Sequence, residues 1–193
     1  MIRIVVVDDH PALRAGLRTV IASEPGLVFA GESGGSEESL WPLLHSVHPD
    51  LILLDYHLPK GDGLQVCYRI KRDRPAPRVA VFTAYASPEL ALPARLAGAD
   101  ALLGKGIGAR ELFEAIRRIH AGEDLLGDVS PSVLTEATAA LPDEQRALVA
   151  MMLAGATKHE AAQTLGVAVP DVEHAVQRII RSLRVASATA GLV

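Results

Sequence analysis

Residues 51–55 read Leu-Ile-Leu-Leu-Asp, four apolar residues followed by a carboxylate. Three other short apolar runs also end on polar or charged side chains. They are residues 4–7 before Asp8 and Asp9, residues 79–82 before Thr83, and residues 101–104 before Lys105. Such runs, separated by amphipathic stretches, are typical of buried parallel strands joined by helices, and ligands bind at the carboxyl ends of these strands. We therefore expect three carboxylates, a hydroxyl and an ammonium to meet in one crevice.

The same alternation predicts an α/β fold with a five-stranded, doubly wound parallel sheet. Two helix boundaries have local causes, because Ser87 with Pro88 is typical of a helix start and Gly98 of a helix end. We expect strands near residues 3–7, 27–32, 51–54, 79–82 and 101–103, and helices near residues 11–23, 36–46, 62–72, 88–97 and 108–120.

The expected cluster of Asp8, Asp9 and Asp55 indicates a metal site for phosphoryl chemistry. Carboxylates that face one another without an arginine repel, and a hard divalent cation such as Mg²⁺ removes that repulsion. A carboxylate can also be the nucleophile that forms an aspartyl phosphate, in a reaction that depends mainly on positioning and charge neutralisation. Lys105 can supply a positive charge and Thr83 a hydroxyl. Each residue alone would be an ordinary turn or surface residue, but their occurrence at four strand ends favours function.

The same residues resemble a known family. Residues 7–17, Val-Asp-Asp-His-Pro-Ala-Leu-Arg-Ala-Gly-Leu, are similar to the opening of bacterial two-component response regulators of the NarL/FixJ class. Residues 55–63, Asp-Tyr-His-Leu-Pro-Lys-Gly-Asp-Gly, resemble the phosphoacceptor loop of that family. The match runs from about Ile2 to about Gly122, and it implies a flavodoxin-like receiver domain over residues 1–122.

The resemblance implies a phosphoacceptor and a set of metal ligands. Asp55 would accept the phosphoryl group. Mg²⁺ would be held by Asp9 directly, by Asp8 through water, by Asp55, and by the backbone carbonyl of His57. We expect His10 to organise the acidic loop rather than to bind metal.

The resemblance also implies how the receiver signals. Thr83 would be the hydroxyl that turns toward the phosphoryl group, and Lys105 would pair with its charge. Leu102 stands where the family often has an aromatic residue, and glycines flank Lys105, which predicts looser or differently routed coupling. The upstream partner would be a sensor histidine kinase, and phosphorylation would favour a homodimer. Such a protein is not a dedicated enzyme, although its receiver would catalyse its own phosphorylation and dephosphorylation.

A linker and a small all-α domain are expected after the receiver. Residues 123–141 have the Gly, Pro and Ser content of a linker, with a short helix around Pro131 to Thr138. Gly166 between two later helices indicates a helix-turn-helix. In residues 142–193 we expect helices from Pro142 to about Ala154, from a capping box at Thr157 and Glu160 onward, and from about Val169 to Leu183.

The helical domain resembles the LuxR-type DNA-binding domain that ends the same class of regulators. That resemblance implies regulation of transcription, with DNA contacts from Lys158, Val172, His174 and Arg178. The family's domain continues into a fourth helix, whereas this sequence stops at Val193, about where that helix would begin.

The expected recognition helix departs from the family in charge. Asp171 and Glu173 stand where relatives usually have basic or neutral residues, and from Pro142 onward five basic residues are balanced by five acidic ones. General electrostatic attraction to DNA is therefore weak. Acids near a helix N-terminus also favour the helix dipole, and an acid can accept a hydrogen bond from cytosine. An output domain that binds a protein rather than DNA is the alternative.

Composition agrees with an intracellular regulator. The chain has 193 residues, of which 49% are hydrophobic, and a formal net charge of −4. It contains no long apolar span and no signal-peptide pattern, so we expect a cytoplasmic protein without membrane contact. The single Cys67 excludes an internal disulfide. Two further alternatives are weaker: an enzyme for a phosphorylated metabolite would need a substrate motif, and an RNA-binding output would not explain Gly166.

Overall fold

The computed structural model describes residues 1–59, 61–72 and 75–190 of the chain. These residues form two compact units. The first unit is Met1–Ala86 with Gly98–Gly127, and the second is Ser87–Ala97 with the residues from Asp128 onward.

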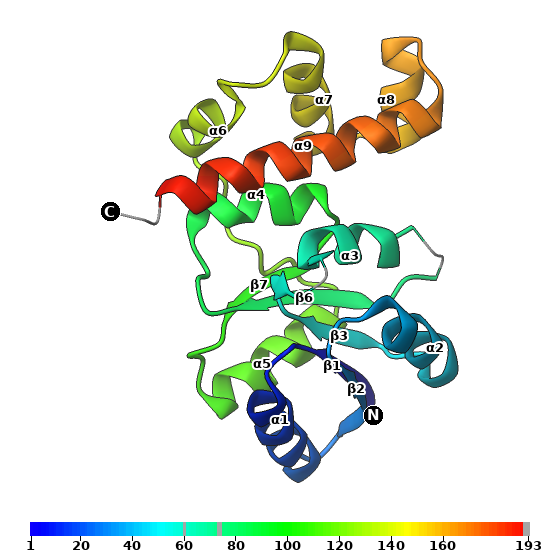
Figure 1. Cartoon of the computed structure of the whole chain (residues 1–193), viewed down its shortest axis with the longest axis vertical. Helices are drawn as coiled ribbons and strands as arrows, with labels where there is room; N and C mark the ends of the chain where they lie inside the picture. Colours follow the sequence, from blue (N-terminus) through cyan, green and yellow to red (C-terminus); the bar gives the residue numbers. More distant parts are fainter. Residues whose placement is uncertain (60, 73–74, 191–193) are drawn as a thin grey trace. The chain divides into compact units, whose positions relative to one another are not determined.

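The first unit contains the predicted five-stranded parallel sheet. Its elements are β1 Ile2–Val7, α1 Pro11–Ser23, β2 Leu27–Ser33, α2 Glu37–Val47, β3 Leu51–Leu54, α3 Gly63–Ile70, β6 Arg78–Thr83, β7 Ala101–Gly104 and α5 Ala109–His120. The strand order is β2-β1-β3-β6-β7, and all neighbouring strands are parallel. Figure 1 shows α1 and α5 on one side of this sheet and α2 and α3 on the other. The predicted fold class is therefore confirmed.

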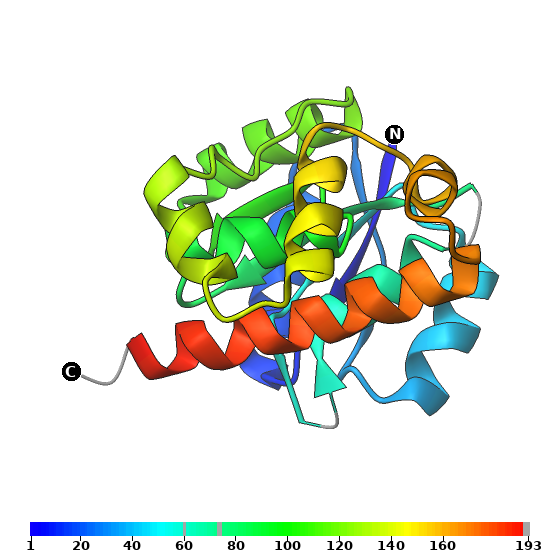
Figure 2. The same cartoon turned by 90° about the horizontal axis from the view of Figure 1, so that it is seen from above.

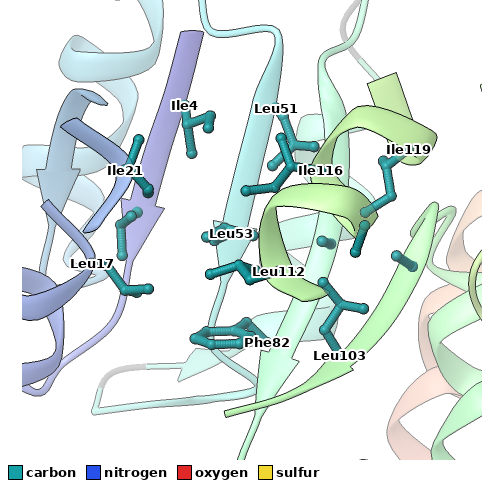
Figure 3. Packing of buried hydrophobic residues seen from close by; sticks show 14 of the residues in the cluster. Ile4, Leu17, Ile21, Leu51, Leu53, Phe82, Leu103, Leu112, Ile116 and Ile119 are labelled. Atoms are coloured by element: carbon teal, nitrogen blue, oxygen red, sulfur yellow. The ribbon is translucent and has the colours of Figure 1, made fainter. Parts of the chain in front are cut away.

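A continuous apolar core joins α1 and α5 to one face of the sheet (Figure 3). On α5 the buried residues are Leu112, Ala115, Ile116 and Ile119, a spacing that places them on one helical face. They meet sheet residues such as Leu53 and Phe82. Burial of each large apolar side chain is worth about 1.5–3 kcal/mol. This core fixes the strands, and with them the positions of the residues at their carboxyl ends.

The segment between β3 and α3 differs from the prediction. We expected a helix from residue 62, but His57–Leu58 (β4) and Gly61–Asp62 (β5) form a small antiparallel pair. The helix begins only at Gly63, because the Asp62 carboxylate accepts a hydrogen bond from the backbone N–H of Leu64 at 2.9 Å and caps it.

The start of the expected linker lies against the sheet. The backbone N–H of Leu125 donates to the Asp100 carbonyl at 2.9 Å, and the N–H of Leu102 donates to the Leu125 carbonyl at 3.1 Å. Leu126 is 4% exposed. Two consecutive leucines thus extend the first unit to Gly127, because they bury apolar surface beside the edge strand β7.

The second unit is helical. It consists of α4 Pro88–Leu96, α6 Pro131–Thr138, α7 Asp143–Leu153, α8 Lys158–Leu165 and α9 Val169–Ala190. Figure 2 shows the long α9 in orange to red, with α8 at its amino-terminal end. The short helix expected around Pro131 to Thr138 and the two helices that flank Gly166 are confirmed. Helix α4 lies within the predicted receiver range, yet its contacts group it with this unit.

Local signals explain the boundaries of α8 and the length of α9. The predicted capping box is present: the Thr157 side chain accepts from the Glu160 N–H, and the Glu160 carboxylate accepts from the Thr157 N–H. Gly166 ends α8 with φ 67°, a left-handed conformation that glycine adopts without strain. The predicted end of α9 at Leu183 is wrong, because no helix-breaking residue occurs before Gly191 and the helix continues to Ala190.

Two expectations drawn from composition can be compared with the structure. Cys67 is fully buried on α3, and burial raises the pKa of its thiol to about 12, so it is an inert core residue. Among the described residues, no helix is both long enough and apolar enough to cross a membrane.

Candidate functional site

The predicted residues follow adjacent strands at the carboxyl edge of the sheet. Val7 of β1 pairs with Leu54 of β3, and the backbone N–H of Asp55 donates to the Val7 carbonyl at 2.7 Å. This register brings Asp8 and Asp55 side by side although the sequence separates them by more than forty positions. On the other side, the backbone N–H of Lys105 donates to the Thr83 carbonyl at 2.8 Å. The parallel register is therefore what gathers the predicted side chains.

Lys105 bridges two buried carboxylates. Its Nζ lies 2.7 Å from Asp8 Oδ2 and 2.8 Å from Asp55 Oδ2, while Asp8 and Asp55 are 1% and 3% exposed. Burial by itself would lower the pKa of Lys105, but its hydrogen bonds to Asp55 and Asp8 and their negative charges outweigh burial and raise that pKa. The side chain is thus an ammonium at neutral pH, and it offsets the charge of both carboxylates.

An acidic group with metal-ligand geometry lies beside this lysine. Asp8, Asp9, His10 and Asp55 each offer one ligand atom, and these atoms lie within 4.8 Å of one another. His10 Nδ1 is 3.0 Å from Asp8 Oδ1 and 2.6 Å from Asp9 Oδ1. Three carboxylates at this spacing supply the hard oxygen donors that Mg²⁺ requires, so the donor set fits such an ion. The predicted clustering of Asp8, Asp9 and Asp55 is therefore present in the fold.

Two basic residues near the acidic loop were not identified from the sequence. Arg14 on α1 donates from Nη1 to the backbone carbonyl of Asp8 at 2.7 Å, and this hydrogen bond holds the acidic loop against α1. Its guanidinium also lies 3.4 Å from Glu32 Oε1, and Arg18 lies 2.7 Å from Glu32 Oε2. The hydrogen bond from Arg18 is the largest cause of a lowered pKa for Glu32, with Arg14 adding to it. The sequence did contain a signal for Arg14. It follows His10 by four residues, and in a helix this spacing places the two side chains on the same face, one turn apart.

Gly63 was also missed, although it lies directly against the site. A Cβ at this position would lie 2.1 Å from the backbone oxygen of Asp55 and 2.9 Å from the Cα of Tyr56. The Gly63 N–H donates to the Tyr56 carbonyl at 2.9 Å. Only a residue without a side chain allows this close approach of two backbone segments.

Thr83 and His57 occupy the predicted places in the chain. Thr83 ends β6 with 0% exposure, and its hydroxyl oxygen accepts a hydrogen bond from the Tyr85 N–H at 3.2 Å. His57 begins β4, two residues after Asp55, with an exposed side chain. The metal contact of the His57 carbonyl and the switch role of Thr83 remain predictions.

The four residues expected to contact DNA have different environments. His174 and Arg178 are exposed on α9, and Lys158 begins α8 with its Nζ 3.8 Å from Glu173 Oε1. Val172 is 1% exposed and belongs to a buried stripe with Val176, Ile179, Ile180 and Leu183. The expectation for Val172 is corrected, because a side chain buried in the helical unit cannot reach a base edge.

The two unexpected acids on α9 have partners within the helical unit. The Asp171 carboxylate accepts a hydrogen bond from the Ala168 N–H at 3.3 Å, which satisfies a backbone donor at the start of the helix. Glu173 pairs with Lys158 on α8. Both acids therefore contribute to the local structure of the two helices that flank Gly166.

Known proteins resemble this chain over the receiver and beyond it. A family model described as the response regulator receiver domain matches residues 4–117. The DNA-binding transcriptional activator DevR/DosR of Mycobacterium tuberculosis is 30% identical over 193 residues, covering 95% of this chain and 88% of that protein. The nitrate/nitrite response regulator NarL of Escherichia coli is 33% identical over 131 residues, covering 68% of this chain and 60% of that protein.

A solved structure agrees with this assignment. The crystal structure of a LuxR-family two-component response regulator from Aurantimonas sp. SI85-9A1 superposes with a TM-score of 0.60 at 32% identity, covering 70% of this chain and 94% of that one. The matched family range contains the acidic loop, Asp55, Thr83 and Lys105. This chain belongs to the response regulators of two-component systems, and its residues 4–117 match their receiver domain.

Proposed function

We propose that a sensor histidine kinase phosphorylates this regulator on Asp55, and that the modification controls transcription through the C-terminal helices. The main support is the contact of one ammonium, that of Lys105, with both Asp8 and Asp55 at 2.7 and 2.8 Å. A buried carboxylate next to a cation and to further carboxylates is suited to accept a phosphoryl group and then to hold its charge.

The chain's own residues would share the work of phosphoryl transfer. A carboxylate oxygen of Asp55 attacks phosphorus and forms an O–P bond while the N–P bond of the donor phosphohistidine breaks. The Lys105 ammonium then pairs with a phosphoryl oxygen, and the Thr83 hydroxyl donates to another. Mg²⁺, held by Asp8, Asp9, Asp55 and the His57 carbonyl, would neutralise phosphoryl charge when it is bound.

Acyl-phosphate labelling tests the assignment of Asp55. The full-length chain with acetyl phosphate and Mg²⁺ should gain one acid-labile phosphoryl group, measured by intact-protein mass spectrometry. Asp55→Asn should abolish the gain, whereas the exposed Asp128→Asn should leave it unchanged. Equal labelling of Asp55→Asn and the parent chain would exclude Asp55 as the acceptor.

For the output we infer DNA binding through α8 and α9. DevR/DosR, which aligns with 95% of this chain, is named as a DNA-binding transcriptional activator. Lys158, His174 and Arg178 supply donors from the two helices that flank Gly166, and two of these side chains are exposed. A homodimer formed on phosphorylation is part of the same proposal.

A second candidate output is a protein partner. The observation that favours it is the charge balance from Pro142 onward, together with Asp171 and Glu173 on the helix that would read DNA. Selection of genomic fragments by the full-length chain, with and without beryllofluoride as a phosphoryl mimic, separates the two candidates. Recovery of a shared sequence supports a transcription factor, whereas no enrichment in either state supports a protein-binding output.

A further inference from the structure

We propose that His10 is a nitrogen ligand of the acidic metal site. As a consequence, the site would bind a later first-row ion such as Ni²⁺ more tightly, relative to Mg²⁺, than a site with oxygen ligands alone. This inference rests on the metal-binding part of the proposed function and goes beyond the organising role that the sequence suggested for His10.

The imidazole of His10 lies where a cation would join two carboxylates. Its Nδ1 is 2.6 Å from Asp9 Oδ1 and 3.0 Å from Asp8 Oδ1, so a single nitrogen contacts both acids. The ligand atoms of Asp8, Asp9, His10 and Asp55 all lie within 4.8 Å of one another. An ion bound between the carboxylates would therefore have this nitrogen within reach, with only a small movement of the ring.

The backbone holds His10 in this position. His10 is the N-cap residue of α1, but its side chain makes no capping hydrogen bond to the helix. Its backbone N–H instead donates to Asp8 Oδ1 at 2.8 Å, and Pro11 fixes the first helical turn. The ring is thus directed to the acids rather than used to cap the helix.

The site has two chemically different sides. Lys105 contacts the Oδ2 atoms of Asp8 and Asp55, whereas His10 contacts Oδ1 atoms of Asp8 and Asp9. The side chains of His10 and Asp9 are 67% and 34% exposed, while those of Lys105 and Asp8 are 16% and 1% exposed. An ion from solvent would therefore enter on the imidazole side.

Ligand chemistry sets the selectivity. Mg²⁺ prefers oxygen donors and keeps much of its hydration, whereas later first-row ions accept imidazole nitrogen readily. Adding one imidazole to three carboxylates should therefore increase the affinity for Ni²⁺ most, the affinity for Mn²⁺ by less, and the affinity for Mg²⁺ least.

Pulsed electron paramagnetic resonance of the full-length chain loaded with Mn²⁺ tests the proposal. The spectrum should show coupling to a directly bound nitrogen, and His10→Asn should remove it. Asparagine keeps a hydrogen-bond donor for the two acids but no imidazole. The same variant should raise the Kd for Ni²⁺ by roughly tenfold, with smaller changes for Mn²⁺ and Mg²⁺. The control His120→Asn, at an exposed histidine on α5, should leave coupling and Kd unchanged.

The outcomes separate His10 from the acidic site itself. Mn²⁺ binding that weakens in Asp9→Asn but shows no nitrogen coupling in the parent chain overturns the role of His10 and leaves the carboxylate site standing. Nitrogen coupling that persists in His10→Asn also overturns it. Mn²⁺ binding that Asp9→Asn does not weaken overturns the acidic site and the inference together.

Discussion

At the scale of single residues, Gly63 connects the start of α3 to the backbone of Asp55. A Cβ there would meet the Asp55 carbonyl oxygen at 2.1 Å, a separation that forces one of the two segments to move. The affected atoms are backbone, so a side-chain rotation cannot relieve the contact. The position of the proposed phosphoacceptor therefore depends on a residue eight positions later.

We predict that Gly63→Ala destabilises the protein by about 1–3 kcal/mol, the usual cost of overpacking, and slows phosphorylation of Asp55. The physical reason is displacement of the Asp55 backbone away from Lys105. Urea unfolding and the rate of labelling by acetyl phosphate measure the two effects. Gly34→Ala is the control, because Gly34 is exposed and a Cβ there meets nothing within 4 Å. A Gly63→Ala variant as stable and as reactive as the control would show that the loop has room to adjust.

At the scale of elements, the capping box sets the start of α8. The backbone N–H groups at the start of a helix have no partners within the helix. The side chains of Thr157 and Glu160 each accept a hydrogen bond from the backbone N–H of the other residue, so both of these donors are satisfied. We predict that Thr157→Ala destabilises α8 by about 1 kcal/mol. Amide hydrogen exchange in residues 161–165 measures this loss. Thr164→Ala is the control, since the Thr164 hydroxyl only donates to the Glu160 carbonyl of the same helix. Equal amide exchange rates in Thr157→Ala and Thr164→Ala would show that the capping box does not stabilise α8.

The same cap predicts a dependence on pH. Hydrogen bonds from the Thr157 backbone and then from its side chain lower the pKa of Glu160 below its ordinary value. A lowered folded-state pKa means that the ionised carboxylate stabilises α8 above the unfolded-state pKa, and that this stability is lost as pH falls through the folded-state pKa. Glu160→Gln should therefore exchange faster than the parent in α8 at pH 7, and the difference should vanish at acidic pH. A difference that stays constant with pH would contradict the role of the charge.

At the scale of the whole molecule, the balance of charge decides how strongly the output helices attract DNA. Asp171→Thr with Glu173→Lys raises the net charge of the first turns of α9 by three, because it removes two carboxylates and adds one ammonium. If these positions face phosphate, affinity for generic duplex should rise, and the slope of log K against log salt should steepen by about one unit, because the variant adds one lysine.

Fluorescence anisotropy with a labelled duplex at several salt concentrations checks this prediction. Asp143→Thr with Glu144→Lys is the matched control, because it makes the same change in net charge in the first turn of α7. If both double variants gain the same affinity, only net charge matters and α9 does not face the DNA. If neither gains affinity, the protein-binding output is favoured.

Much of the fold and of the candidate site could be predicted from the sequence. The order of strands and helices follows from short apolar runs and amphipathic stretches, whose periods are local properties of the chain. Asp8, Asp55 and Lys105 could be grouped in advance because parallel strands present their carboxyl ends at one edge. The capping box at Thr157 and Glu160 could also be predicted, because its two partners are only three residues apart in the sequence.

Only the tertiary structure decided the features that depend on close approach between separate segments. The backbone contact below Asp55 explains Gly63, and the fold of the acidic loop turns His10 toward two carboxylates rather than into a helix cap. Burial removed Val172 from the residues that can contact DNA. The sequence by itself determined which side chains follow each strand, because that is local. The distances and exposure of those side chains were decided by packing, because they depend on atoms far away in the chain.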